Sequence, residues 1–141
     1  MKLYEVHETS IAIYLVVELL SGGELFEKLK EKKTYTEKDC AVLLRRMIEP
    51  LVYMHEKGIM HRDIKPENLI LRSKDNEFDI VIADLGLATE INTKNVIHAR
   101  CGTPGYCAPE ILNSRSGKMD YDAKCDVFSM GCVFYHMYYH F

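Results

Sequence analysis

The order of apolar and polar residues predicts strands at the start of the chain and a short helix after them. Leu3–Val6 and Ile11–Leu20 are rich in Ile, Val and Tyr, and the polar run HETS separates them, which predicts two neighbouring strands. The Ser-Gly-Gly that follows ends the second strand. Apolar residues then recur at helical spacing within ELFEKLKEKK, residues 24–33, which predicts a short helix.

The longest predicted helix begins at Thr36. This residue and Asp39 have the spacing of an N-terminal cap, and Gly58 is a suitable residue for the C-terminal end. Pro50 inside the helix removes one backbone hydrogen bond and should bend it. The apolar spacing predicts that one face of this helix is buried, formed by Ala41, Leu44, Ile48 and Leu51.

Two further patterns complete the expected secondary structure. NLILRS and FDIVIAD are apolar runs on either side of the polar KDNE, which predicts a β-hairpin over residues 68–84. AKCDVFSMGCVFYHMYYHF, residues 123–141, predicts a helix buried on most sides because it is almost entirely apolar.

Composition and charge narrow the class of protein. The 141 residues are 48% hydrophobic and 28% charged, which is typical of one globular domain or part of one. A net charge of −3 gives no reason to expect nucleic acid or an anionic membrane as a partner. The N-terminus lacks the apolar core of a signal peptide, and the five cysteines include no CxxC pair. We therefore expect a cytoplasmic protein with reduced thiols.

Three short motifs, in order, carry the chemistry of the sequence. His61-Arg62-Asp63 is followed by Asn68, then by Asp84-Leu85-Gly86, and finally by Ala108-Pro109-Glu110. With GTPGY at residues 102–106, this series resembles a serine/threonine protein kinase domain of the calcium/calmodulin-dependent branch, over nearly the whole chain. The resemblance implies a partial protein-kinase fold of the α+β class, in which residues 1–20 are the last small-lobe strands and the hinge. Residues 21–141 would be the first half of the helical large lobe, through its central helix.

The resemblance also implies a role for each charged residue in phosphoryl transfer from ATP. Asp63 would orient the acceptor hydroxyl and accept its proton, and Lys65 would neutralise charge on the transferred phosphate. Asn68 and Asp84 would supply the hard oxygen ligands that Mg²⁺ prefers. Arg62 would face the activation segment, residues 84–110, where its partner would be a phosphate group.

Five residues are expected around the nucleotide. By resemblance, Val17 would lie beside the adenine, Glu18 and Leu20 would offer it backbone hydrogen bonds, and Ile70 would form the floor under its ring. Glu24 would reach the ribose or a basic substrate side chain. An acidic residue at the start of a helix can equally serve the helix dipole, and that alternative stays open for Glu24.

The substrate class also follows from the resemblance. Lys65 within KPEN is typical of kinases that act on Ser and Thr in proteins, and Thr103 is expected beside Asp63 and Lys65. Glu67 together with Glu24 suggests a preference for basic residues upstream of the acceptor. Nothing in the sequence indicates whether calmodulin binds.

A further group of residues is expected to support the site. His61 and Leu85 would pack in the column that links the two lobes, where Leu85 stands in place of the usual Phe. Asp126 would hold the backbone of the His-Arg-Asp motif. Glu110 would normally pair with an arginine of the later helices, which these 141 residues do not include, so it is expected to lack that partner. The activation segment has Ala99 where related kinases often carry a phosphorylated Thr. If phosphorylation controls this protein, Thr89 or Thr93 must serve, or the control lies elsewhere and Arg62 has no phosphate to meet.

Several features of the family are not found within these 141 residues. Upstream of Gly58 the only glycines are Gly22 and Gly23, and no Lys lies in a VAIK-like context. We therefore expect the isolated chain to be a poor kinase or none, and a catalytically dead, kinase-like binding module is the alternative. An unrelated α+β hydrolase is a weaker alternative, because no nucleophile motif is present. We also expect apolar residues of the last helix to be exposed, namely Val127, Phe128, Val133, Phe134 and Met137.

Overall fold

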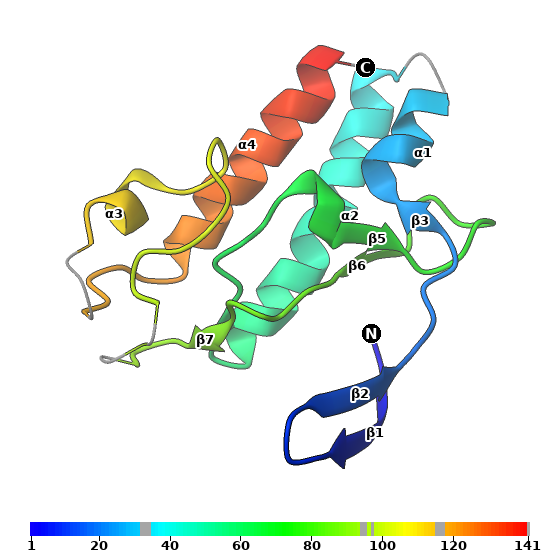
Figure 1. Cartoon of the computed structure of the whole chain (residues 1–141). Coiled ribbons are helices and arrows are strands. Elements are labelled where there is room, and N and C mark those ends of the chain that lie inside the picture. Colours follow the sequence, from blue (N-terminus) through cyan, green and yellow to red (C-terminus); the bar gives the residue numbers. More distant parts are fainter. Residues whose placement is uncertain (32–34, 94–95, 97, 115–117, 141) are drawn as a thin grey trace.

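The structure, a computed structural model, describes residues 1–31, 35–93, 96, 98–114 and 118–140 (Figure 1). The strands of the described residues all lie in the first two thirds of the chain, and the elements of the last third are helices. The elements in order are β1 (Leu3–Glu8), β2 (Ile13–Val17), β3 (Gly23–Glu24), α1 (Leu25–Glu31), α2 (Glu37–Glu56), β4 (Ile59–Met60), η1 (Pro66–Asn68), β5 (Leu69–Leu71), β6 (Ile80–Ile82), β7 (Thr89–Glu90), α3 (Pro109–Leu112) and α4 (Lys124–His140). The predicted α+β class is confirmed.

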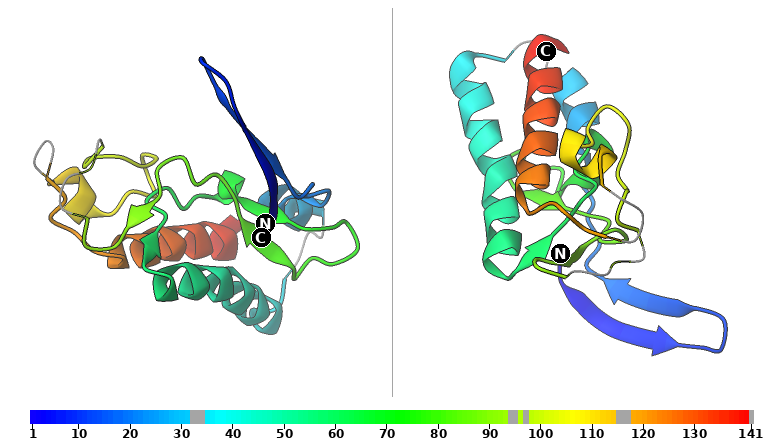
Figure 2. Two further views of the ribbon diagram at one scale, coloured as in Figure 1. Left: turned by 90° about the horizontal axis from the view of Figure 1, so that it is seen from below. Right: turned by 90° about the vertical axis from the view of Figure 1, so that its left-hand side faces the viewer.

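The first two strands form an antiparallel hairpin that projects from the rest of the molecule (Figures 1 and 2). Both strands were predicted, although β2 is shorter than the apolar run from Ile11 to Leu20. Every residue of β1 is exposed, and so are Ile13, Tyr14, Leu15 and Val16 of β2. The hairpin is therefore held by its own backbone pairing and not by burial in the core.

A three-stranded sheet in the order β3-β5-β6 lies beside α1. The predicted hairpin around KDNE is confirmed as β5 and β6, which pair antiparallel from Leu69 with Ile82 to Leu71 with Ile80. Glu24 lies in β3, opposite Ile70, and the short helix begins one residue later. Residues 32 and 33, the end of the helix expected from sequence, lie outside the described residues.

The ends of α2 agree with the sequence. The Thr36 side chain accepts a hydrogen bond from Asp39 N, and the Asp39 carboxylate accepts one from Thr36 N, which is a complete capping box. Gly58 has a φ of +74° just beyond the last helical turn, and its N–H donates to His55 O at 2.9 Å. Glycine adopts this left-handed conformation at low cost, so it stops the helix.

The buried face of α2 was predicted wrongly. Ala41 and Ile48 are exposed and Leu44 is half-buried, and of the four predicted residues only Leu51 is in the core. The core face instead contains Cys40, Leu43, Met47 and Leu51. The helix has apolar residues on two sides, and the spacing alone could not decide which side meets α4 and the sheet.

The last helix, α4, packs against α2 along one stripe (Figure 2). Met130, Val133 and Met137 are buried at helical spacing and join the main core. The opposite face is open, so α4 is not buried on most sides as predicted: Val127, Phe128, Tyr135, Tyr138 and Tyr139 are exposed. Of the residues expected to be exposed, only Val127 and Phe128 are. Phe134 is partly buried, and Val133 and Met137 are buried because they face α2 and the sheet.

Across the described ranges, no helix combines the length and the apolar character needed to cross a bilayer.

Candidate active site

A buried loop between β4 and η1 presents the His-Arg-Asp motif. His61, Arg62 and Asp63 are all less than a tenth exposed, and Arg62 has a φ of +69°. This conformation is unfavourable for a residue with a Cβ and persists only where surrounding contacts enforce it. The enforcing group is the buried carboxylate of Asp126, which accepts hydrogen bonds from His61 N at 2.8 Å and Arg62 N at 2.7 Å. The His55 ring contacts the same carboxylate at 2.9 Å.

The ring of His61 connects this loop to the end of β6. Its Nε2 lies 3.0 Å from the carbonyl oxygen of Ala83, and its Nδ1 accepts a hydrogen bond from Asp63 N at 3.2 Å. Because a carbonyl oxygen only accepts, these two contacts assign the proton to Nε2. His61 therefore fixes Asp63 on one side and the residue before Asp84 on the other.

Asp63, Lys65 and Thr103 form a connected polar cluster. The Thr103 hydroxyl donates to Asp63 Oδ1 at 2.6 Å, Lys65 Nζ lies 2.9 Å from Asp63 Oδ2, and Lys65 Nζ donates to Thr103 Oγ1 at 3.1 Å. Burial raises the pKa of Asp63, but the hydrogen bonds from Thr103 and Lys65 outweigh it, so the pKa lies below its ordinary value. The hydrogen bond to Asp63 raises the pKa of Lys65. The cluster is thus an ionised carboxylate beside a protonated amine at neutral pH.

Asn68 and Asp84 lie on adjacent segments. The Asn68 side-chain nitrogen donates to Asp63 O at 2.9 Å, and the Asn68 carbonyl accepts from Ala83 N at 2.9 Å. Asp84 has a φ of +59°, and its Oδ1 accepts from Gly86 N at 3.1 Å. Because the Asn68 nitrogen is engaged with the loop, the amide oxygen is the atom left to face a cation. One amide oxygen and one carboxylate are a hard-oxygen pair that fits Mg²⁺, which takes its remaining ligands from water and phosphate.

The residues expected around the nucleotide lie on the segment from β2 to β3 and on β5. Val17 and Leu20 are half-buried, and Ile70 lies in the central strand of the sheet opposite Glu24. Glu18 N donates to Lys2 O at 2.8 Å, so its carbonyl oxygen, and not its N–H, is the group it could offer to adenine. The Glu18 side chain pairs with Arg72, whose hydrogen bond lowers the pKa of Glu18.

Arg62 turns its guanidinium toward the activation segment. Its Nε donates to Leu87 O and its Nη1 to His98 O, both at 2.7 Å. Nη1 also donates to the Tyr121 hydroxyl at 3.1 Å. Tyr121 was missed from the sequence. It lies in a polar stretch outside every motif, and only its contact with Arg62 identifies it.

One of the supporting residues, Leu85, is more exposed than expected. Leu85 is 53% exposed, so the packing expected of it is not seen. Asp84 before it is in a left-handed conformation, and the chain there runs at the surface. Glu110 lies exposed in the short helix α3, where its carbonyl accepts from the Ser114 hydroxyl at 3.3 Å.

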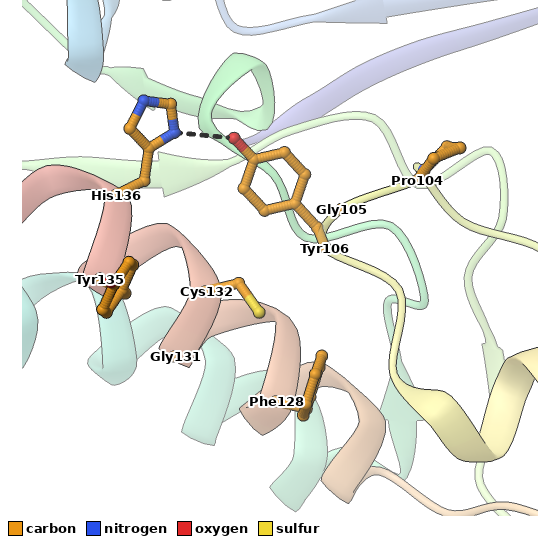
Figure 3. A pocket seen from close by; sticks show the side chains of 8 residues that line it. All are labelled: Pro104, Gly105, Tyr106, Phe128, Gly131, Cys132, Tyr135 and His136. Atoms are coloured by element: carbon orange, nitrogen blue, oxygen red, sulfur yellow. Dashed lines mark hydrogen bonds between the residues drawn. The ribbon is translucent and has the colours of Figure 1, made fainter.

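The activation segment also contacts α4. Figure 3 shows Tyr106 reaching toward His136, and its hydroxyl lies 3.0 Å from His136 Nδ1. Ser129 Oγ of α4 donates to Tyr106 O at 2.7 Å. An open pocket of about 770 Å³ lies between this loop and α4, lined by Pro104, Gly105, Tyr106, Phe128, Gly131, Cys132, Tyr135 and His136.

Comparison with known proteins agrees with the resemblance. The family model described as protein kinase domain matches residues 1–140. The chain is 44% identical over 133 residues to Myosin light chain kinase A of Dictyostelium discoideum, covering 94% of this chain and 44% of that protein. It is 42% identical over 134 residues to Calcium/calmodulin-dependent protein kinase type 1 of Macrobrachium nipponense and to type IV of Homo sapiens. These matches cover 95% of this chain and 37% and 28% of those proteins.

The chain thus spans less than half the length of these relatives. The family model nevertheless covers all but the final residue, and the relatives are calcium/calmodulin-dependent and myosin light chain kinases. The chain belongs to the protein kinase family and is, by family, a protein serine/threonine kinase.

Proposed function

We propose that these residues transfer the γ-phosphate of ATP to Ser and Thr hydroxyls of protein substrates in the cytoplasm. The observation that carries the proposal is the cluster of Asp63, Lys65 and Thr103. In it an ionised carboxylate already accepts a hydrogen bond from a Thr hydroxyl at 2.6 Å. A substrate hydroxyl is chemically the same group, and Asp63 would orient it and take its proton.

Lys65 would act on the other reactant. Its amine lies 2.9 Å from Asp63 and is held protonated by that contact. A fixed positive charge next to the proton acceptor stabilises negative charge on the phosphate as it moves toward the hydroxyl. Asp63 would therefore act on the acceptor hydroxyl, and Lys65 on the phosphate.

Asn68 and Asp84 would hold Mg²⁺, whose charge would neutralise the phosphate oxygens. Val17, Glu18, Leu20, Glu24 and Ile70 are proposed to bind the nucleotide. Glu24 and Glu67 are both exposed and acidic, which supports a preference for substrates with basic residues upstream of the acceptor. The domain assignment follows from these roles, with residues 1–20 as small lobe and hinge and 21–141 as large lobe.

A polypeptide of only these residues should transfer phosphate slowly. The Gly-rich loop and strand Lys of the family are not found in residues 1–57. Removing one group that stabilises developing charge typically costs about a hundred- to a thousandfold in rate. The same observation favours the alternative, a kinase-like binding module without catalysis.

The deciding experiment is phosphate transfer by the purified chain. The chain is incubated with labelled ATP, Mg²⁺ and Ser, Thr and Tyr peptides, alongside Asp63→Asn and a control, Asp75→Asn, in the exposed turn between β5 and β6. Slow labelling of Ser or Thr peptides that Asp63→Asn abolishes supports the enzyme. Equal labelling by wild type and Asp63→Asn, or none with either, favours the binding module. Nucleotide binding is tested separately by the thermal stabilisation that ATP gives in the presence of Mg²⁺. This stabilisation should be lost in Asp84→Asn.

A further inference from the structure

Three of the five guanidinium N–H groups of Arg62 donate to neutral groups of the chain itself. Its guanidinium is buried and donates to two backbone carbonyls of the activation segment, Leu87 O and His98 O, and to the Tyr121 hydroxyl. Both hydrogens of Nη1 are used by His98 and Tyr121. The position at which a phosphate group was expected from sequence therefore already has hydrogen-bond acceptors.

The Tyr121 hydroxyl contacts both Arg62 and the activation segment. It accepts from Arg62 Nη1 at 3.1 Å and donates to Ala99 O at 2.7 Å. Hydrogen bonds that involve an ionised donor are stronger than neutral ones, and consecutive bonds polarise one another. One hydroxyl thus connects Ala99 to the loop that contains His61, Arg62 and Asp63, the catalytic loop.

The segment lies close against the loop beyond this point. A Cβ placed on Gly102 would lie 2.9 Å from Arg62 O, so the two backbones are in contact there. One residue further, Thr103 reaches Asp63 and Lys65. Ala99 is 3% exposed and carries no hydroxyl that could be phosphorylated. The course of the chain from Ala99 to Thr103 is therefore set by contacts within the protein.

We propose that Tyr121 is a positioning residue, whose hydroxyl bridges Arg62 and Ala99 and holds the activation segment on the catalytic loop without a phosphate group. Its effect on turnover rests on the proposed function. Its effect on the segment does not, and the two are measured separately.

The test compares Tyr121→Phe, which removes only the hydroxyl, with Tyr53→Phe on the exposed surface of α2. Arg100 is exposed and follows Ala99 directly, so trypsin cleavage after Arg100 reports opening of the segment. We expect cleavage there to be about tenfold faster in Tyr121→Phe, because a tenfold change matches the weakening of about one hydrogen bond. The rate in Tyr53→Phe should equal wild type, and urea unfolding should show both variants folded. Treating wild type with a broad-specificity phosphatase should leave the rate unchanged.

Equal cleavage of Tyr121→Phe and Tyr53→Phe would overturn the proposal, as would faster cleavage after phosphatase treatment. If Tyr121→Phe does not fold, a measurement on the wild-type protein can still test the proposal. The Arg62 guanidinium protons, assigned in NMR spectra with Arg62→Lys, should exchange with water more slowly than those of exposed Arg100, and equally fast exchange overturns the proposal.

Turnover provides the remaining readout. Where the chain phosphorylates a peptide, Tyr121→Phe should lower kcat several-fold and leave the KM for ATP unchanged, because Tyr121 acts on the acceptor side. Unchanged kcat would overturn the positioning role. Absence of transfer by wild type would refute the proposed function and leave the cleavage result standing.

Discussion

Thr103 and Asp63 are separated by 40 positions in the sequence and joined by a hydrogen bond of 2.6 Å. This hydrogen bond is one of the interactions that lower the pKa of Asp63. In Thr103→Ala the pKa of Asp63 should rise, because burial raises this pKa and one of the hydrogen bonds that lower it would be lost. Thr103→Ser keeps the hydroxyl and should leave the value near that of wild type. Titration of the Asp63 carboxyl carbon by NMR measures both, and an equal shift in the two variants would contradict the assignment.

The stability of the protein should depend on Asp63 at acidic pH. Its pKa in the folded state lies below the ordinary value of 3.8, so the unfolded chain binds the proton more readily. The stabilisation is present above the ordinary value and is lost as the pH falls through the lower folded value. Between about pH 5 and about pH 2, Asp63→Asn should lose less unfolding free energy than wild type. Urea unfolding across this range provides the measurement, and parallel curves would show that Asp63 carries no such linkage.

Asp126 should be one of the costliest residues to remove. Its buried carboxylate accepts from two backbone N–H groups, which Asp126→Ala would leave without that acceptor. A hydrogen bond to a charged group contributes about 1.5–3 kcal/mol, so we expect a loss of about 3–5 kcal/mol in unfolding free energy. Asp75→Ala, in the exposed turn between β5 and β6, should change it by less than about 0.5 kcal/mol. Similar losses in both variants would mean that the buried carboxylate has no special role.

The buried face of α2 seen in the structure predicts that substitutions at Leu43 and Ile48 differ in their effect on stability. Leu43 is 1% exposed and Ile48 is 38% exposed. Leu43→Ala should cost about 2–5 kcal/mol of unfolding free energy because it leaves a cavity in the core. Ile48→Ala should cost less than about 1 kcal/mol, since its side chain is already partly in water. The reverse order in urea unfolding would restore the face expected from sequence.

Local signals predicted the elements well. The capping residues Thr36 and Asp39, the Gly58 stop and the KDNE hairpin depend on short-range chemistry, and each lies where expected. The buried side of α2 and α4 depends on which neighbours each helix meets. That information is not contained in the spacing of apolar residues along a single helix.

The site shows the same division. The motifs identified Asp63, Lys65, Asn68 and Asp84, and the structure brings the first three together through side-chain and backbone hydrogen bonds. The partners of Arg62 could not be read from the sequence. They are carbonyl oxygens and a tyrosine hydroxyl, and a carbonyl group is present at every position of a chain.

The distance along the chain between Asp126 and the loop it holds also bears on synthesis. Asp126 follows His61 by 65 residues, so the ribosome releases the His-Arg-Asp motif well before the carboxylate that fixes its backbone. Until that carboxylate emerges and α4 packs, the two backbone hydrogen bonds that offset the cost of the left-handed conformation at Arg62 cannot form. The nascent loop should therefore sample open conformations, and its catalytic geometry should be among the last features of this region to form.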